Sequence, residues 1–246
     1  MGLRIFLAGA TGVIGRPLIR LLRGAGHSVV GTTRTMEGKT VLEALGVEAT
    51  VVDVFDRDAL AQVVKGAGPD VVIHQLTDLA AGLDPKVQEE TLKRNARLRR
   101  EGTANLVRAA RAAGVKRLVA QSIAWAYAPK ELPWREGDPL DVDATGLRAI
   151  SVRDGVVPLE AAVLDQGDFD GIVLRYGQLY GPGTWSREPT GTAPVHVEAA
   201  AHAAFLAVAR GRPAAYNIAE PGGAVAIDRA VSELGWRPAF RLEPHG

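Results

Sequence analysis

One segment near the amino terminus constrains the fold more than any other. The apolar run Arg4–Ala8 leads directly into three glycines spaced three residues apart, at Gly9, Gly12 and Gly15, and an apolar helical pattern starts at Arg16. Glycines let a backbone turn sharply and let a pyrophosphate approach it, while the first turn of a helix offers unpaired N–H groups and a positive dipole end. The segment therefore predicts a dinucleotide site, although the same spacing also suits a tight turn that binds nothing.

Composition excludes several other classes of protein. The formal net charge is +1, so no global charge favours a nucleic acid or an acidic surface as partner. The chain has no cysteine, which excludes disulfides, thiol catalysis and thiolate metal sites. No apolar run approaches the roughly 20 residues of a membrane helix, and a strand pattern stands where a leader would be. We expect a cytoplasmic protein with a small-molecule substrate, without nucleic-acid or membrane partners and without a metal site.

Strand and helix patterns alternate along the chain. Strand patterns cover Arg4–Ala8, Ser28–Thr32, Ala49–Val52, Val71–His74, Arg117–Gln121 and Gly171–Arg175. Helical patterns cover Arg16–Arg23, Lys39–Leu45, Asp58–Val64, Lys86–Ala113 and Val152–Leu164. This alternation predicts an α/β fold, a Rossmann-type doubly wound parallel sheet whose ligands lie beyond the carboxyl ends of the strands. We expect residues 1–176 to form a dinucleotide-binding domain and residues 177–246 a small substrate lobe interleaved with the last sheet elements.

The order of motifs resembles the extended short-chain dehydrogenase/reductases, in particular the NAD-dependent epimerase/dehydratase family. The resemblance covers nearly the whole chain and rests on Gly9–Gly15, Val52–Val54, Asn95, Glu101–Val107, Gly114–Val119, Gln121–Ser122, Leu174–Gly183, His196–Glu198, Tyr216–Ile218 and Leu234–Pro238. The stretch between Trp185 and His196 is shorter than in most members of the family. This departure indicates a small substrate lobe and a small substrate.

Residues expected to contact the cofactor come from the glycine loop and from the ends of later strands. In the loop they are Gly9, Thr11, Gly12, Val13, Ile14 and Gly15. The resemblance adds Asp53, Val54, Gln75, Leu76, Thr77, Asn95, Gln121, Tyr176 and Gly177. It implies that Asp53 lies beside the adenine, where the alternative role is a cap for the following helix.

The residues at the end of the second strand pattern indicate whether the cofactor is NAD or NADP. They read Thr33-Arg34, with no acidic residue before Glu37. An acid there accepts the ribose 2′-OH of NAD, whereas a cation suits the 2′-phosphate of NADP. Arg34 can pair with a phosphate through two hydrogen bonds, so the sequence predicts NADP in preference to NAD. The alternative is a solvated loop arginine.

Two further groups of polar residues receive a structural interpretation. The helix that carries Asn95 has a basic run at Arg94, Arg97, Arg99 and Arg100. Because no aromatic residues interleave with this run, we interpret it as a solvated helix face. His74 ends the fourth strand pattern, and a lone histidine there is more often structural than catalytic.

The usual catalytic residues of the family are missing. The resemblance implies a tyrosine as general acid/base, a lysine four residues later that lowers its pKa, and a serine or threonine that binds the substrate oxygen. Aligned on Glu160, the tyrosine and lysine positions fall on Val152 and Val156, and the serine position falls on Ile123. No YxxxK pattern occurs anywhere in the chain.

Tyr127 and Ser122 are the remaining candidates for proton transfer. We expect Tyr127 to donate the proton, with Ser122 or a water, and with a pKa little below its usual value because no lysine follows Lys130. Ser122 stands one position before the family serine, which reverses its facing in a strand. The nearby cations, Arg153 and Arg175, do not exchange protons at neutral pH.

Two functions remain open at this point. One is an NADP-dependent oxidoreductase or epimerase/dehydratase-like enzyme that acts on a small carbonyl or sugar-derived substrate with non-standard catalytic residues. The other is a catalytically inactive NADP(H)-binding sensor or scaffold. The resemblance also implies a homodimer through the helices Lys86–Ala113 and Val152–Leu164. The second helix carries an apolar stripe that either faces a partner or packs on the sheet, namely Val152, Val156, Leu159 and Val163.

Overall fold

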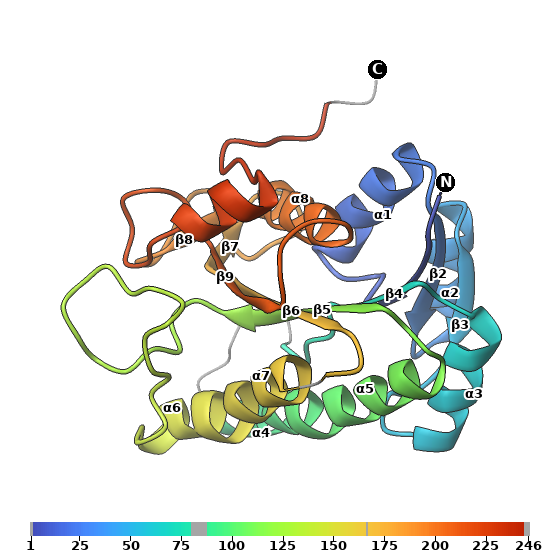
Figure 1. The fold of residues 1–246 in the computed structure, drawn as a ribbon, viewed down its shortest axis with the longest axis horizontal. Coiled ribbons are helices and arrows are strands. Elements are labelled where there is room, and N and C mark those ends of the chain that lie inside the picture. The colour runs from blue at the N-terminus through green and yellow to red at the C-terminus, as the bar shows by residue number, and fades with distance from the viewer. Residues whose placement is uncertain (1, 80–87, 166, 244–246) are drawn as a thin grey trace.

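A seven-stranded parallel sheet forms the centre of the molecule (Figure 1). This computed structural model describes residues 2–79, 88–165 and 167–243. The strands of the sheet are β1 (Arg4–Ala8), β2 (Ser28–Thr33), β3 (Glu48–Val51), β4 (Val71–His74), β5 (Arg117–Ile123), β6 (Asp170–Tyr176) and β9 (Ala214–Ile218). Their order is β3-β2-β1-β4-β5-β6-β9, and all neighbouring pairs are parallel. The predicted fold class is confirmed.

Helices cover both faces of the sheet, which is why its central strands are apolar without alternation. The helices are α1 (Gly15–Gly24), α2 (Met36–Ala44), α3 (Arg57–Ala67), α4 (Gln88–Arg97), α5 (Thr103–Ala112), α6 (Gly146–Ser151), α7 (Val157–Leu164) and α8 (Val197–Ala207). In Figure 1, α1 and α8 lie above the sheet, and the helices from α3 to α7 lie below it. Among the described residues, no helix has the length and apolar character needed to cross a bilayer.

Both long helices below the sheet contain a π-helical turn. The turn η1 (Leu98–Gly102) joins α4 to α5, and the turn η2 (Val152–Val156) joins α6 to α7. The two turns pack against each other. The predicted helix over residues 86–113 corresponds to α4, η1 and α5, and its first two positions lie outside the described residues. π-helical turns within α-helices are frequent at functional sites.

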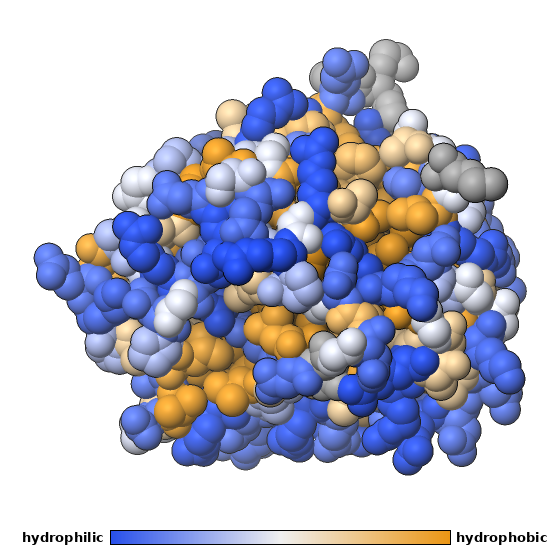
Figure 2. Space-filling model, viewed as in Figure 1, coloured by the Kyte–Doolittle hydropathy of each residue, from blue (hydrophilic) through white to orange (hydrophobic). Residues whose placement is uncertain are grey.

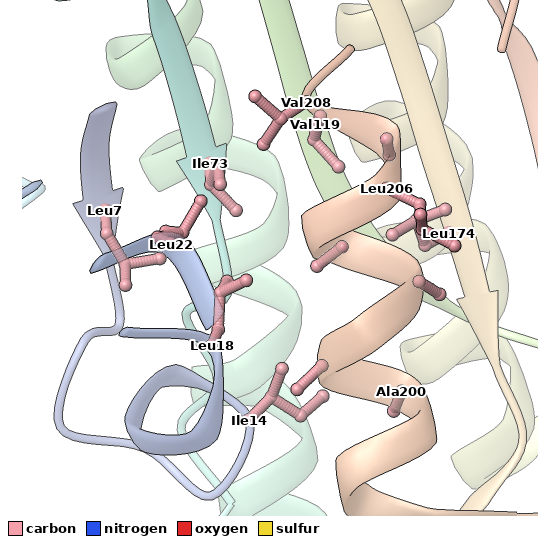
Figure 3. Close-up of a cluster of buried hydrophobic side chains, with 14 of the residues drawn as sticks. Leu7, Ile14, Leu18, Leu22, Ile73, Val119, Leu174, Ala200, Leu206 and Val208 are labelled. Atoms are coloured by element: carbon pink, nitrogen blue, oxygen red, sulfur yellow. The ribbon is translucent and has the colours of Figure 1, made fainter. Parts of the chain in front are cut away.

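The larger hydrophobic core lies between the sheet and the layer of α1 and α8. Figure 3 shows Leu18 and Leu22 of α1 beside Leu7 of β1, and Leu206 of α8 beside Leu174 of β6. Full burial of one such side chain contributes roughly 1.5–3 kcal/mol. This packing holds α1, and with it the glycine loop, firmly on the sheet.

The apolar stripe of the second long helix packs inside its own chain. Val152, Val156, Leu159 and Val163 are each at most 1% exposed. Leu159 and Val163 join the core below the sheet, whereas Val152 and Val156 pack with Ile123. The stripe therefore gives no support to a dimer.

Figure 2 shows an apolar area at its lower left, over α6 and the segment before it, and both Val142 and Leu147 in this part of the chain are exposed.

The carboxyl-terminal part of the chain builds elements that the sequence patterns did not predict. They include β9, α8, the two-stranded pair β7 (Gln178–Tyr180) and β8 (Pro194–His196), and the turn η3 (Ala230–Leu234). Helix α8 is rich in alanine and buried on nearly all sides, so it lacks the amphipathic period that marks a surface helix. Because β9 pairs with β6, this part of the chain completes the main sheet. The domain division at residue 176 stays a prediction.

Candidate functional site

The predicted cofactor residues lie along one edge of the sheet. All seven strands are parallel, so their carboxyl ends share that edge. The chain leaves β1 toward β2 and β3 on one side and later returns to β4 on the other side. Ligands of open α/β sheets bind at such a switch point. The glycine loop follows β1 directly at this position.

The glycine loop has a backbone that only glycine supports. Gly9 has a φ of +88°, and a Cβ there would lie 2.5 Å from the carbonyl oxygen of Gln75. A Cβ at Gly15 would overlap the carbonyl oxygen of Gly9. The N–H of Gly12 donates to that same oxygen at 3.1 Å and closes the turn. The loop thereby brings β1 and the start of α1 into close contact.

The first turn of α1 is open to an anion. Its N-cap, Ile14, has no capping side chain, and the first turn has no acidic residue. Gly12 and Val13 are exposed, so a ligand can reach the start of the helix. A Cβ at Gly183 would lie 3.8 Å from Val13, which places the turn after β7 beside the loop. An uncapped helix start beside a glycine turn fits the pyrophosphate of a dinucleotide.

Arg34 is available for a ligand. It follows β2, its side chain is exposed, and no hydrogen bond or ion pair joins it to another described residue. Thr35 is occupied, because its hydroxyl caps α2 by accepting from the N–H of Gly38 at 3.1 Å. The side chain of Thr33 accepts from the N–H of Thr35 at 3.4 Å. A free guanidinium at this place fits a phosphate.

Asp53 does not cap the helix that follows it. Its carboxylate accepts from the N–H of Phe55 at 2.9 Å, and Asp56 caps α3 by accepting from Ala59 at 3.0 Å. The carbonyl of Val54 accepts from the Asn105 side chain at 3.1 Å. These bonds fix the backbone beyond β3 and leave the Asp53 side chain exposed at the edge.

Two buried amides hold the backbone beyond β4. Gln121 of β5 donates from Nε2 to the carbonyl oxygen of Leu76 at 2.7 Å. Asn95 of α4 accepts on Oδ1 from the N–H of Asp78 at 2.9 Å. Thr77 lies between these two anchors and is exposed. The segment is therefore held in a fixed position with its outer side open.

Tyr176 ends β6 and is sealed beneath this edge. Its hydroxyl accepts from Gln75 Nε2 at 3.2 Å, while Gln75 Oε1 has no partner among the described residues. Burial raises the pKa of Tyr176 far above its usual value, so the hydroxyl stays neutral. The N–H of Gly177 donates to Ile218, which ties the next residue to β9.

Tyr127 and Ser122 are both engaged in a buried hydrogen-bond network. Tyr127 donates to Asn217 Oδ1 at 2.5 Å and accepts from Arg175 at 2.8 Å, and Ser122 donates to Glu160 at 2.6 Å. Arg175 and Glu160 form an ion pair at 2.6 Å with both side chains at most 6% exposed. Burial raises the pKa of Tyr127 to about 12, although Arg175 lowers it. The expectation of a slightly lowered pKa was wrong.

An apolar cluster contains the three positions that the resemblance assigns to the catalytic side chains. Ile123, Val152 and Val156 are 8%, 1% and 0% exposed and pack together with Ala126. None of these side chains donates or accepts a proton. This part of the site excludes water and supplies no acid or base.

His74 is also engaged and neutral. Its Nε2 lies 2.8 Å from the hydroxyl of Thr103, and its Nδ1 accepts from the N–H of Leu76 at 3.2 Å. Burial, followed by the charge of Arg99, lowers the pKa of His74 to about 4. A structural role explains these contacts. No group of three or more His, Asp or Glu side chains in the described part of the chain could hold a metal ion.

Arg99 is the residue that the sequence interpretation placed wrongly. Arg94, Arg97 and Arg100 are exposed, as expected for a solvated face, but Arg99 is only 5% exposed. It lies in η1, four residues after Asn95, and the helical period places both on one face. That spacing was the signal that could have identified it.

Sequence comparison assigns the chain to a family. The profile of the NAD dependent epimerase/dehydratase family matches residues 5–214, and the chain belongs to this family. The 3-diazoavenalumate denitrifying reductase of a Streptomyces species is 47% identical over 192 residues. This match covers 78% of the chain and 61% of that relative, so the chain spans about three fifths of the relative's length. The resemblance inferred from the motifs is confirmed.

Solved structures share the fold at low sequence identity. The UDP-glucose 4-epimerase of Thermus thermophilus, in complex with NAD, has a TM-score of 0.77 at 20% identity and covers 97% of this chain and 95% of its own. The enzyme WbmG of Bordetella bronchiseptica, in complex with NAD and UDP, has a TM-score of 0.73 at 20% identity, with 98% and 91% covered.

Proposed function

We propose that this protein is an NADP(H)-dependent reductase that replaces the diazo group of a small carboxylate by hydrogen. The observation that carries the proposal is the apolar cluster of Ile123, Val152 and Val156 at the positions of the family's proton-transfer residues. The 47% identical relative, a 3-diazoavenalumate denitrifying reductase, supports the substrate class. The apolar cluster favours a reduction that needs no acid or base from the protein.

The chemistry of diazo replacement matches such a site. A bound nicotinamide cofactor supplies a hydride. In the net reaction, R–N2⁺ and hydride give R–H and dinitrogen: the C–H bond forms, the C–N bond breaks, and its electron pair leaves with dinitrogen. Carbonyl reduction differs, because the alkoxide that it forms must be protonated. A general acid is therefore dispensable in the first reaction and required in the second.

The apolar cluster has a positive role in this proposal. A diazonium group also reacts with water, and nearly complete burial of Val152 and Val156 keeps water away from this side of the site. In this proposal Tyr127 and Ser122 support the site through the network around Glu160 and Arg175. Their assignment as the proton-transfer pair stays a prediction, and it is the competing interpretation.

The cofactor is proposed to bind along the edge described above. The uncapped start of α1 and the glycine loop take the pyrophosphate, and Arg34 with Thr33 takes the 2′-phosphate of NADP. Asp53 and Val54 lie on the adenine side. The contacts proposed on the nicotinamide side are Gln75, Leu76, Thr77, Asn95, Gln121, Tyr176 and Gly177. The homodimer and the cytoplasmic location also stay predictions.

The test is turnover of 3-diazoavenalumate with NADPH. We expect loss of NADPH absorbance in step with dinitrogen release, and transfer of deuterium from NADPH labelled at C4 to the carbon that loses nitrogen. Small aldehydes and ketones are the control substrates, and we expect no reduction of them. Reduction of the carbonyl compounds without dinitrogen release would reject the proposal. Tight NADPH binding without any turnover would favour the alternative, a binding protein that has lost its chemistry.

A further inference from the structure

Arg99 carries a buried positive charge that no described residue pairs with directly. Its side chain donates no hydrogen bond and forms no ion pair with any described residue, although only 5% of the residue is exposed. Burial lowers its pKa to about 10, and the negative charge of Glu160 raises it. Arginine remains protonated at neutral pH in such a site. A buried cation without a partner is costly to a protein and therefore needs an explanation.

The neighbouring charges do not supply a counterion. Glu160 is already paired, because Oε1 and Oε2 accept from Arg175 at 3.0 and 2.6 Å, and Oε1 also accepts from Ser122. His74 is neutral at pH 7. The buried charged side chains in the described part of the chain are Arg99, Arg175 and Glu160, so two positive charges face one negative charge. One positive charge is left over.

The Arg99 side chain lies beside the turn that carries the apolar cluster. A Cβ at Gly155 would lie 3.3 Å from Arg99 Cδ, and Gly155 directly precedes Val156 of the apolar cluster. Only Gln75 Oε1 and His202 Nδ1 are both sealed from solvent and without a partner among the described residues. The Arg99 nitrogens are thus unpaired but not sealed. The paired π-helical turns η1 and η2 provide this arrangement.

We propose that Arg99 is the anion-binding residue of the substrate site and that it takes the carboxylate of a small organic acid. The planar guanidinium matches a carboxylate through two parallel hydrogen bonds. Binding of one carboxylate would neutralise the excess charge of the buried group. The proposal rests on the proposed function for the place of the substrate, but it makes a separate claim about charge recognition.

The test compares a carboxylate with its neutral amide. We titrate the NADP⁺-loaded protein with cinnamate and with cinnamamide by calorimetry, since both are planar and differ in charge. We expect cinnamate to bind at least tenfold more tightly than cinnamamide, and Arg99→Met to abolish this difference. Arg99→Lys should retain part of it. Arg97→Met is the matched control, because Arg97 is exposed and paired with Glu101 on the same helix.

Separate measurements cover folding and the cofactor. Arg99→Met should melt at or above the temperature of the unmodified protein, since it removes an unpaired buried charge. Gly155→Ala should also weaken cinnamate binding, because the added methyl group would lie 3.2 Å from the Cα of Ala96 and 3.3 Å from Arg99 Cδ and must displace one or both.

Three outcomes would overturn the proposal. In the first, the unmodified protein binds cinnamate and cinnamamide equally well or binds neither. In the second, Arg99→Met binds cinnamate as tightly as the unmodified protein does. In the third, Arg99→Met loses as much affinity for NADPH as it loses for cinnamate. The last outcome would assign the charge to the cofactor. Failure of dinitrogen release with intact charge selectivity would reject only the proposed function.

Discussion

Replacing Arg175 by methionine should strongly destabilise the protein. The substitution removes two hydrogen bonds to Glu160, at 3.0 and 2.6 Å, and one to Tyr127 at 2.8 Å, all buried, and a part-buried one to the carbonyl oxygen of Glu136 at 3.2 Å. It leaves Glu160, 4% exposed, without its ion-pair partner. Breaking a buried pair in this way costs roughly 3–5 kcal/mol. We expect the lower end, about 3 kcal/mol, because the charge of Arg99 still acts on Glu160.

Denaturant unfolding measures this change, and thermal melting provides a second readout. A loss of about 3 kcal/mol corresponds to a decrease in Tm of roughly 6–12 °C for a chain of this size. The paired variant Arg175→Met with Glu160→Leu should recover much of the loss, since neither charge of this pair remains in the core. Arg111→Met is the control, because it removes only an exposed ion pair, the one that Arg111 forms with Asp168 at 2.7 Å. A loss below about 1 kcal/mol in Arg175→Met would refute the view that this pair stabilises the site.

Three further predictions concern cofactor choice, proton transfer and pH. Arg34→Asp should reverse a preference for NADPH over NADH by about 2–3 kcal/mol, measured by calorimetry, and equal affinities of the unmodified protein for both cofactors would contradict it. Tyr127→Phe should keep dinitrogen release and NADPH binding, whereas loss of turnover with intact binding would favour Tyr127 as the donor. The folded-state pKa of His74, about 4, lies below its unfolded value of 6.5, so the unfolded chain binds more protons between these values. Stability should therefore decrease by up to about 3 kcal/mol as the pH falls from 6.5 to 4, and an unchanged slope in the His74→Gln variant would contradict this.

The amino-terminal half of the fold could be predicted because its signals are local. The pattern for β1 matched the observed strand at both ends, and so did the pattern for β4. Glycine spacing fixed the position of the turn, since Gly9 and Gly15 leave no room for a Cβ. The edge of the sheet followed from parallel topology alone. In these segments the residue types by themselves indicate the backbone geometry.

The carboxyl-terminal half depends on contacts that a pattern does not contain. Strand β9 begins at Ala214 and is placed by pairing with β6, some 40 residues earlier in the chain. The pKa of the Tyr127 hydroxyl could not be predicted from the sequence for the same reason. Burial raises its pKa, and its hydrogen-bond partners Arg175 on β6 and Asn217 on β9, neither of which is near in sequence, lower it in part. Long-range packing, and not residue type, decides the chemistry of this hydroxyl.

The buried charge of Arg99 gives a physical reason for an apolar residue, and not a lysine, at position 156. Val156 directly follows Gly155, and a Cβ at Gly155 would lie 3.3 Å from Arg99 Cδ. A lysine at position 156 would bring a second cation toward a buried group that already has one positive charge in excess, and like charges in a poorly solvated site repel strongly. An apolar residue at 156 is therefore what Arg99 requires. In the proposal, Val156 and Arg99 therefore belong to one local arrangement: the apolar residue at 156 leaves Arg99 as the cation for a carboxylate.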